Sequence, residues 1–173
     1  MLRTPLNKAY IKRTIRPLYG WTQATPAATW LDPDWDESVD IYPGMVMMSG
    51  STQDTVTLID GTGDPLGLSA LYVGGDGINE PQDAGINAFA VWTLAPDAEF
   101  EILAPAFDDS LGTWVVPTDG TTLLIHAQTT GANRGKLVPA GTANASTLPI
   151  ARLVKVNSTS KITIGGLRPQ DVA

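Results

Sequence analysis

The pattern of apolar and polar residues along this chain predicts many short β-strands. DTVTLID (54–60) and FEILAP (100–105) alternate apolar and polar side chains, the period-two pattern of a strand with one buried face. VDIYPGMVMMSG (39–50) has the pattern of two strands joined by a Pro-Gly turn, and AFAVWTL (88–94) is a continuous apolar run of the length of a buried strand. Further strands are expected at LSALYV (68–73), TWVVP (113–117), TTLLIHAQ (121–128), ARLVKV (151–156) and KITIGG (161–166).

Turn-forming residues separate these segments. The chain has 17 Gly and 13 Pro, and clusters such as GTGDPLG (61–67) lie between the predicted strands. Residues 74–87 and 129–149 are expected to be long loops, rich in small and polar residues. With 43% hydrophobic residues in 173, the chain can bury one core. These features predict a mainly β fold, a compact antiparallel β-barrel or sandwich.

Residues 1–31 have a different pattern from the rest of the chain. Pro5, Pro17 and Pro26 interrupt any helix, so KAYIKRTIR (8–16) could form at most about two helical turns. TQATPAAT (22–29) has the composition of a linker. We therefore expect an extended N-terminal arm over 1–31, followed by a β-rich body over 32–173.

Charge is divided along the chain in the same way. The arm has five basic residues and no acid, whereas residues 32–133 have no Lys or Arg and hold all 18 acidic residues of the chain except Asp171. The segment 134–173 is basic again. One interpretation is an acidic body with two positive ends that face a negative partner. In the other, the C-terminal strands lie among the acidic ones and neutralise them.

A protein surface suits the arm better than nucleic acid does. The acidic body would repel phosphate, and no recognition helix, RNP-like motif or zinc finger is present. No apolar run is long enough for a membrane helix. Tyr, Trp and Arg dominate protein interfaces, so the arm either lays its rings on a partner or wraps its own domain. For the first alternative, the candidate binding residues are Arg3, Tyr10, Lys12, Arg13, Arg16, Tyr19 and Trp21.

The sequence offers little for catalysis, and we expect no enzyme and no cofactor. The chain has no Cys, and its one His, His126, lies in a predicted core strand. DPDWDESVD (32–40) begins like an EF-hand, but Glu37 stands where that loop needs Gly and Pro43 where it needs Glu. A divalent site of another kind, here or at Asp76, Glu80 and Asp83, stays open.

The middle and end of the chain resemble a known family. IYPGMVMM, DTVTLIDGTGDPLGLSALYV, GDGINEP and AFAVWTLAPDAEF, within about 38–165, follow the layout of the β-tulip type of capsid decoration (head-stabilising, cement) protein of tailed bacteriophages. The resemblance implies a structural virion protein on the capsid exterior, bound to the major capsid protein. It also implies a homotrimer whose arm clamps across capsid subunits.

Two alternatives remain beside this resemblance. A phage tail or head-fibre base protein would share the β content and trimeric habit, and a small carbohydrate-binding β-module would need exposed rings. Trp92 and Trp114 are expected to lie in the core instead, because they fall in strand-like runs.

Overall fold

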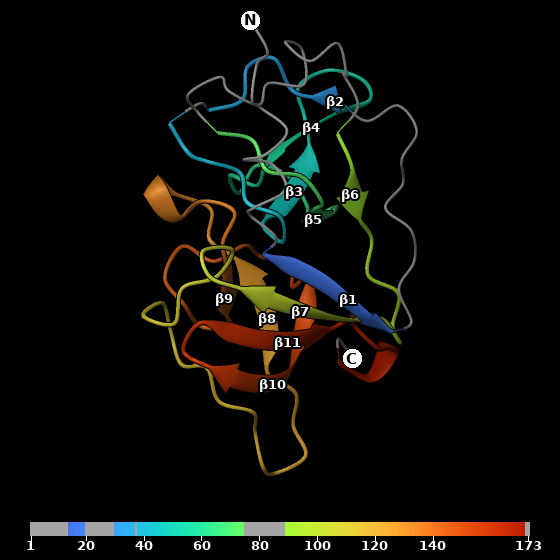
Figure 1. The fold of residues 1–173 in the computed structure, drawn as a ribbon, viewed down its shortest axis with the longest axis vertical. Coiled ribbons are helices and arrows are strands. Elements are labelled where there is room, and N and C mark those ends of the chain that lie inside the picture. Colours follow the sequence, from blue (N-terminus) through green and yellow to red (C-terminus); the bar gives the residue numbers. More distant parts are fainter. Residues whose placement is uncertain (1–13, 20–29, 37, 75–88, 172–173) are drawn as a thin grey trace, which may run out of the picture.

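The computed structural model describes residues 14–19, 30–36, 38–74 and 89–171. The described residues are mainly β and form two sheets (Figure 1), which confirms the predicted mainly β class. The helical part consists of two single 3₁₀ turns, η1 (Gly131–Asn133) and η2 (Pro169–Asp171). No helix in the described part of the chain is long and apolar enough to span a membrane.

The larger sheet has six strands in the order β1-β7-β11-β10-β8-β9, with every neighbouring pair antiparallel. It curls into a half-barrel. Leu137 of β9 donates its N–H to the carbonyl of Ala106 at 2.9 Å, so the segment that comes after β7 covers the far edge of the sheet. The strands are β1 (Ile15–Tyr19), β7 (Glu99–Leu103), β8 (Leu124–Ala127), β9 (Leu137–Pro139), β10 (Ala151–Ser158) and β11 (Lys161–Gly165).

The smaller sheet has five strands in the order β2-β4-β3-β5-β6. Its pairs are antiparallel except β2–β4, which is parallel. The predicted Pro-Gly turn leads into β3: Met45 donates to the carbonyl of Tyr42 at 3.0 Å, and Gly44 has φ +98°, which a side chain would disfavour. The strands are β2 (Trp30–Leu31), β3 (Val46–Ser49), β4 (Thr55–Leu58), β5 (Gly67–Ser69) and β6 (Val91–Trp92).

One apolar core joins the two sheets. The rings of Trp92 on β6 and Phe100 on β7 lie 5.7 Å apart, and Val46 of β3 donates to the carbonyl of Gly135 beside β9 at 2.8 Å. The core's fully buried side chains come from both sheets and include Met45, Met47, Leu58, Leu68, Phe89, Phe100, Ile102, Phe107, Ile125 and Leu137. The described body is therefore a single packed unit.

Some local predictions were wrong. TWVVP (113–117) is not a strand: Val115 and Val116 lie on the surface, 60% and 39% exposed. The predicted loop 129–149 contains η1 and the buried strand β9. The first six residues of KAYIKRTIR lie outside the described residues, and its last two, Ile15 and Arg16, begin β1. The predicted loop 74–87 lies almost wholly outside the described residues.

Two described segments of the predicted arm take part in the sheets. β1 pairs with β7 over Ile15–Tyr19, and β2 pairs with β4. The body therefore includes these segments as well as residues 32 onward, whereas residues 1–13 and 20–29 lie outside the described residues.

Candidate functional site

Thr14 fixes the point at which residues 1–13 join the body. It is buried, its carbonyl accepts the N–H of Leu103 at 2.8 Å, and its hydroxyl donates to the carbonyl of Pro43 in the Pro-Gly turn. Thr14 thus ties β1 to β7 and to the turn before β3. The described chain therefore begins at the junction of the two sheets.

β1 forms because its side chains alternate. Ile15 and Pro17 are partly buried, and they pair with the buried Ile102 and Phe100. Arg16 and Leu18 point outward and are exposed. Arg16 reaches Glu101 on β7 at 3.1 Å, but its side chain is 66% exposed, so this ion pair adds little stability.

The outer edge of β1 offers few hydrogen-bond donors. Since Thr14 accepts from β7, the antiparallel alternation turns the backbone groups of Ile15 and Pro17 away from β7. Pro17 has no N–H, and proline at such a position protects an edge from strand addition. A partner at this edge would therefore contact side chains rather than extend the sheet.

Of the seven candidate binding residues, the structure brings two together. Arg16 and Tyr19 both lie on β1, where Tyr19 pairs with Glu99. The other five, Arg3, Tyr10, Lys12, Arg13 and Trp21, lie outside the described residues.

Four of the six bases in the C-terminal segment form ion pairs with acids of the fold. Arg134 lies 3.6 Å from Asp36, Lys136 lies 3.8 Å from Asp108, and Lys161 lies 3.5 Å from Glu101. The alternative of interleaved charges is therefore confirmed for these residues, whereas Lys155 and Arg168 form no ion pair among the described residues.

Arg152 is the most buried of these cations. Its guanidinium lies 3.9 Å from Glu99 and 3.8 Å from Asp171, and its Nε donates to the carbonyl of Gly166 at 3.2 Å. The three ionic side chains are only 11%, 14% and 4% exposed. Asp171 also accepts from the hydroxyl of Thr122, so the cluster ties β7, β10 and η2 to the residues just before β8.

Many of the body's acids hold turns. In four Asp-x-Ser/Thr segments, one carboxylate oxygen accepts both the N–H and the hydroxyl of the residue two positions on, at 2.5 to 3.0 Å. Hydrogen bonds from Ser38 and Ser110 are the main cause of the lowered pKa of Asp36 and of Asp108. The four pairs are Asp36–Ser38, Asp60–Thr62, Asp108–Ser110 and Asp119–Thr121.

Asp32 is a buried turn carboxylate. It accepts the N–H of Asp34 at 2.9 Å, the N–H of Ser51 and the hydroxyl of Thr55. Burial raises its pKa, but the hydrogen bonds outweigh burial and leave the pKa below its ordinary value. Among the described residues, no three acidic or His side chains are grouped closely enough to hold a metal ion, and Glu37, Asp76, Glu80 and Asp83 fall outside them.

His126 has a structural place. It lies on β8, and its Nδ1 is 2.7 Å from the carbonyl oxygen of Ser146. Ser146 in turn accepts the N–H of Ala127. The pair ties β8 to the segment before β10.

A projecting loop, residues 112–122, is the feature that sequence reasoning missed. Figure 1 shows this segment, between β7 and β8, extending past β10 at the end of the molecule away from the five-stranded sheet. Almost all its residues are exposed, and Val115 is the most exposed large apolar side chain in the described structure. A Gly on either side of the apolar run and Pro117 directly after it were the available signals for a loop.

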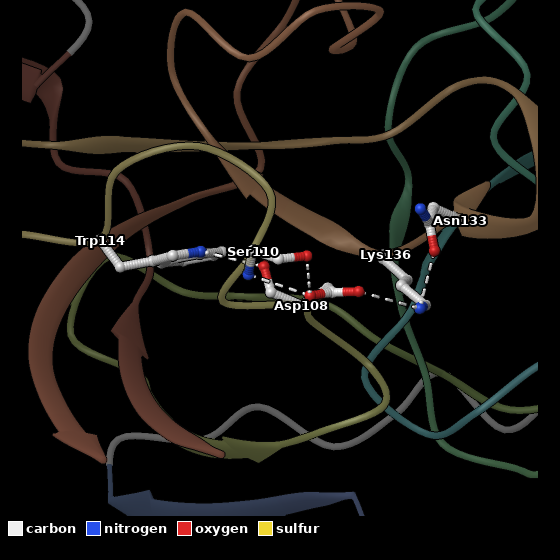
Figure 2. Close-up of polar contacts among 5 residues, drawn as sticks. All are labelled: Asp108, Ser110, Trp114, Asn133 and Lys136. Atoms are coloured by element: carbon white, nitrogen blue, oxygen red, sulfur yellow. Dashed lines mark hydrogen bonds and ion pairs between the residues drawn. The ribbon is translucent and has the colours of Figure 1, made fainter. Parts of the chain in front are cut away.

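The base of this loop is held firmly (Figure 2). The indole of Trp114 donates to the carbonyl of Asp108 at 3.1 Å and packs edge-on against Phe107. The carboxylate of Asp108 holds Ser110 and faces Lys136, which donates to Asn133 of η1 at 2.8 Å. Trp114 thus packs against the core, as expected, while the two valines after it are exposed.

A comparison with protein families gives this geometry its context. A family model described as phage cement protein matches residues 1–173. The chain belongs to the phage cement protein family. No curated protein and no solved structure matches it.

Membership of this family gives the protein a structural role. It is a phage protein that associates with the capsid and stabilises it. This agrees with the resemblance seen in the sequence.

Proposed function

We propose that this cement protein binds the outer surface of the phage capsid and that its N-terminal arm clamps across neighbouring capsid subunits. The observation that carries this proposal is the charge of the arm: residues 1–31 have five bases and no acid, next to a body segment without a base. Arg16 has a partner inside the fold, whereas Arg3, Lys8, Lys12 and Arg13 precede the first described strand.

The attachment of the arm supports a clamp. Thr14 anchors the arm to both sheets through β7 and the Pro-Gly turn, so tension on residues 1–13 passes into the core. An extended chain of this length reaches roughly 43–47 Å. That reach is enough to cross a boundary between two capsid subunits.

The rings of the arm supply most of the proposed binding energy. Exposed ion pairs contribute about 0–1 kcal/mol each, whereas burial of apolar surface contributes about 25 cal/mol per Å². Tyr10, Tyr19 and Trp21 therefore act as anchors in apolar grooves, and Arg3, Lys12, Arg13 and Arg16 orient them against acidic groups of the major capsid protein. Within this proposal the protein is a homotrimer of the β-tulip type on the capsid exterior.

Arm deletion tests the proposal. The deletion should remove residues 1–13 only, because a deletion through residue 21 would also remove β1 and expose its side of β7. We expect the shortened protein to unfold at the same denaturant concentration as the full chain but to bind undecorated capsids much more weakly in co-sedimentation, because the deletion removes Tyr10 and four of the arm's five bases.

The matched control changes a base outside the arm. Lys155→Glu alters an exposed cation on β10 that has no ion pair in the described structure, and we expect it to bind capsids like the parent. Full occupancy of the shell by the deletion variant would show that the arm is not the clamp.

A further inference from the structure

We propose that residues 112–122 form a second capsid contact, in which Val115 and Val116 enter an apolar hollow of the capsid protein. This inference rests on the proposed function, because it takes the capsid exterior as the partner. The exposed valines and the acidic residues of the loop together suit a partner surface that is apolar at its centre and basic at its rim.

The exposure of the two valines is the first argument. Single apolar residues on a surface are ordinary. Here, however, two adjacent valines, 60% and 39% exposed, share a projecting loop. Val115 is the most exposed large apolar side chain in the described structure. Binding of a partner that covers these two side chains would remove their apolar surface from water, which favours the complex.

The rigidity of the base is the second argument. Trp114 fixes one end of the loop through Phe107 and Asp108, and Thr122 fixes the other through its 2.9 Å hydrogen bond to Asp171. Between them, Asp119 accepts two hydrogen bonds from Thr121 and shapes the tip. A loop held in this way loses little conformational entropy on binding.

Charge decides between the capsid and a second copy of the chain. The segment 108–122 contains Asp108, Asp109 and Asp119 and no base, and Lys136 neutralises only the first. Two such loops that met at a symmetry axis would bring like charges together. A basic rim on the capsid protein suits them, and the capsid is the partner of this family.

The position of the loop suits a two-point attachment. The arm root at Thr14 lies beside the Pro-Gly turn, where the two sheets meet, whereas the loop projects at the far end of the six-stranded sheet (Figure 1). When one of two contacts on the same body is bound, the other is held close to its own binding site at a high effective concentration. The two contacts together therefore bind more tightly than either alone. The loop would therefore hold the body on the shell while the arm crosses the seam.

The direct test measures capsid affinity of the full chain carrying Val115→Ser and Val116→Ser. Burial of a valine side chain in a partner's apolar surface favours binding in proportion to the area covered, and these two side chains are partly covered already. We expect binding to undecorated capsids to weaken about 10- to 100-fold. The matched control is Leu148→Ser with Val156→Ser, which removes two other exposed apolar side chains (46% and 37%) and should leave affinity within about twofold.

A cross-linking measurement identifies what covers the loop. The chain has no Cys, so Val115→Cys carries a single benzophenone-maleimide probe, and mass spectrometry maps the product on decorated capsids. Cross-links to the capsid protein are expected. Cross-links to a second copy, or none at all, would overturn the inference.

The arm deletion separates this inference from the proposed function. If the deletion strongly weakens binding while the double serine variant binds like the parent, the clamp stands and the loop contact is refuted. If the parent protein itself does not bind the capsid exterior, the proposed function fails and the loop contact fails with it. If both variants bind weakly and both fold normally, both proposals hold.

Discussion

Arg152 offers the sharpest test of how the body is held together. We consider Arg152→Met, which keeps an unbranched chain of similar length and removes the charge. The change leaves Glu99 and Asp171 without the cation that lies 3.9 and 3.8 Å away, and it leaves the carbonyl of Gly166 without its donor. The two carboxylates are 14% and 4% exposed, so water cannot replace the guanidinium well.

The expected loss can be worked from these distances. At an effective dielectric constant of 20, each charge pair at this separation is worth about 4 kcal/mol before desolvation is subtracted. Removing one partner of a buried pair costs about 3–5 kcal/mol when the geometry is good. Both distances here are long, so we expect a loss of about 2–4 kcal/mol in the free energy of unfolding. For a domain of this size that is a fall of about 5–15 °C in melting temperature.

Urea unfolding followed by tryptophan fluorescence measures this loss. Arg168→Met is the control, because Arg168 is exposed and its side chain forms no ion pair among the described residues. We expect the control to stay within about 0.5 kcal/mol of the parent. Asp171→Asn, added to Arg152→Met, should restore part of the stability because it removes one uncompensated charge. A stability of Arg152→Met within about 0.5 kcal/mol of the parent would refute the proposed role of the cluster.

Two further predictions concern the acidic turns. Asp32→Asn should lower the free energy of unfolding by about 1–3 kcal/mol, since the buried carboxylate accepts hydrogen bonds from Asp34, Ser51 and Thr55. Urea unfolding measures this loss beside the control Asp64→Asn, which changes an exposed carboxylate. Equal losses in the two variants would contradict the prediction. The pKa values of Asp32, Asp36, Asp60 and Asp108 are lowered in the folded protein. The contribution of these carboxylates to the free energy of unfolding is therefore complete above the unfolded pKa of about 3.9. It is lost as pH falls through the lower pKa values of the folded protein. Melting temperatures between pH 7 and pH 2.5 should fall mainly below about pH 4, and less steeply in Asp36→Asn/Asp60→Asn/Asp108→Asn; a fall centred near pH 6 would disprove this assignment.

Local pattern was enough to predict strands that lie over the core. Apolar and polar residues alternate in DTVTLID, and the segment contains β4, in which Val56 and Leu58 are buried. The Pro-Gly turn could be predicted because it depends on its own residues alone, with Gly44 at the positive φ. The buried Trp35 and Phe89 lie outside the strands, which shows that burial by itself does not define one.

The predictions were wrong where contacts between residues far apart in the sequence determine the local structure. TWVVP has the composition of a strand, but only Trp114 finds a core partner, Phe107, and the valines after it have none. β9 is a strand because Leu137 pairs with both β8 and Ala106, which the sequence around it does not reveal. Ion pairs such as Arg134–Asp36 join residues far apart in the chain, so the charge division along the sequence does not persist in space. The Asp-x-Ser/Thr turns, in contrast, were visible in the sequence and could have been predicted.

An electron cryomicroscopy reconstruction of capsids, with and without this protein, tests the central claim most directly. The account predicts density for the protein on the outer surface only, with residues 1–13 running from Thr14 across the boundary between two capsid subunits. Density confined to one subunit, with residues 1–13 folded back on their own body, would contradict the clamp. Density inside the shell would contradict the proposed exterior binding altogether.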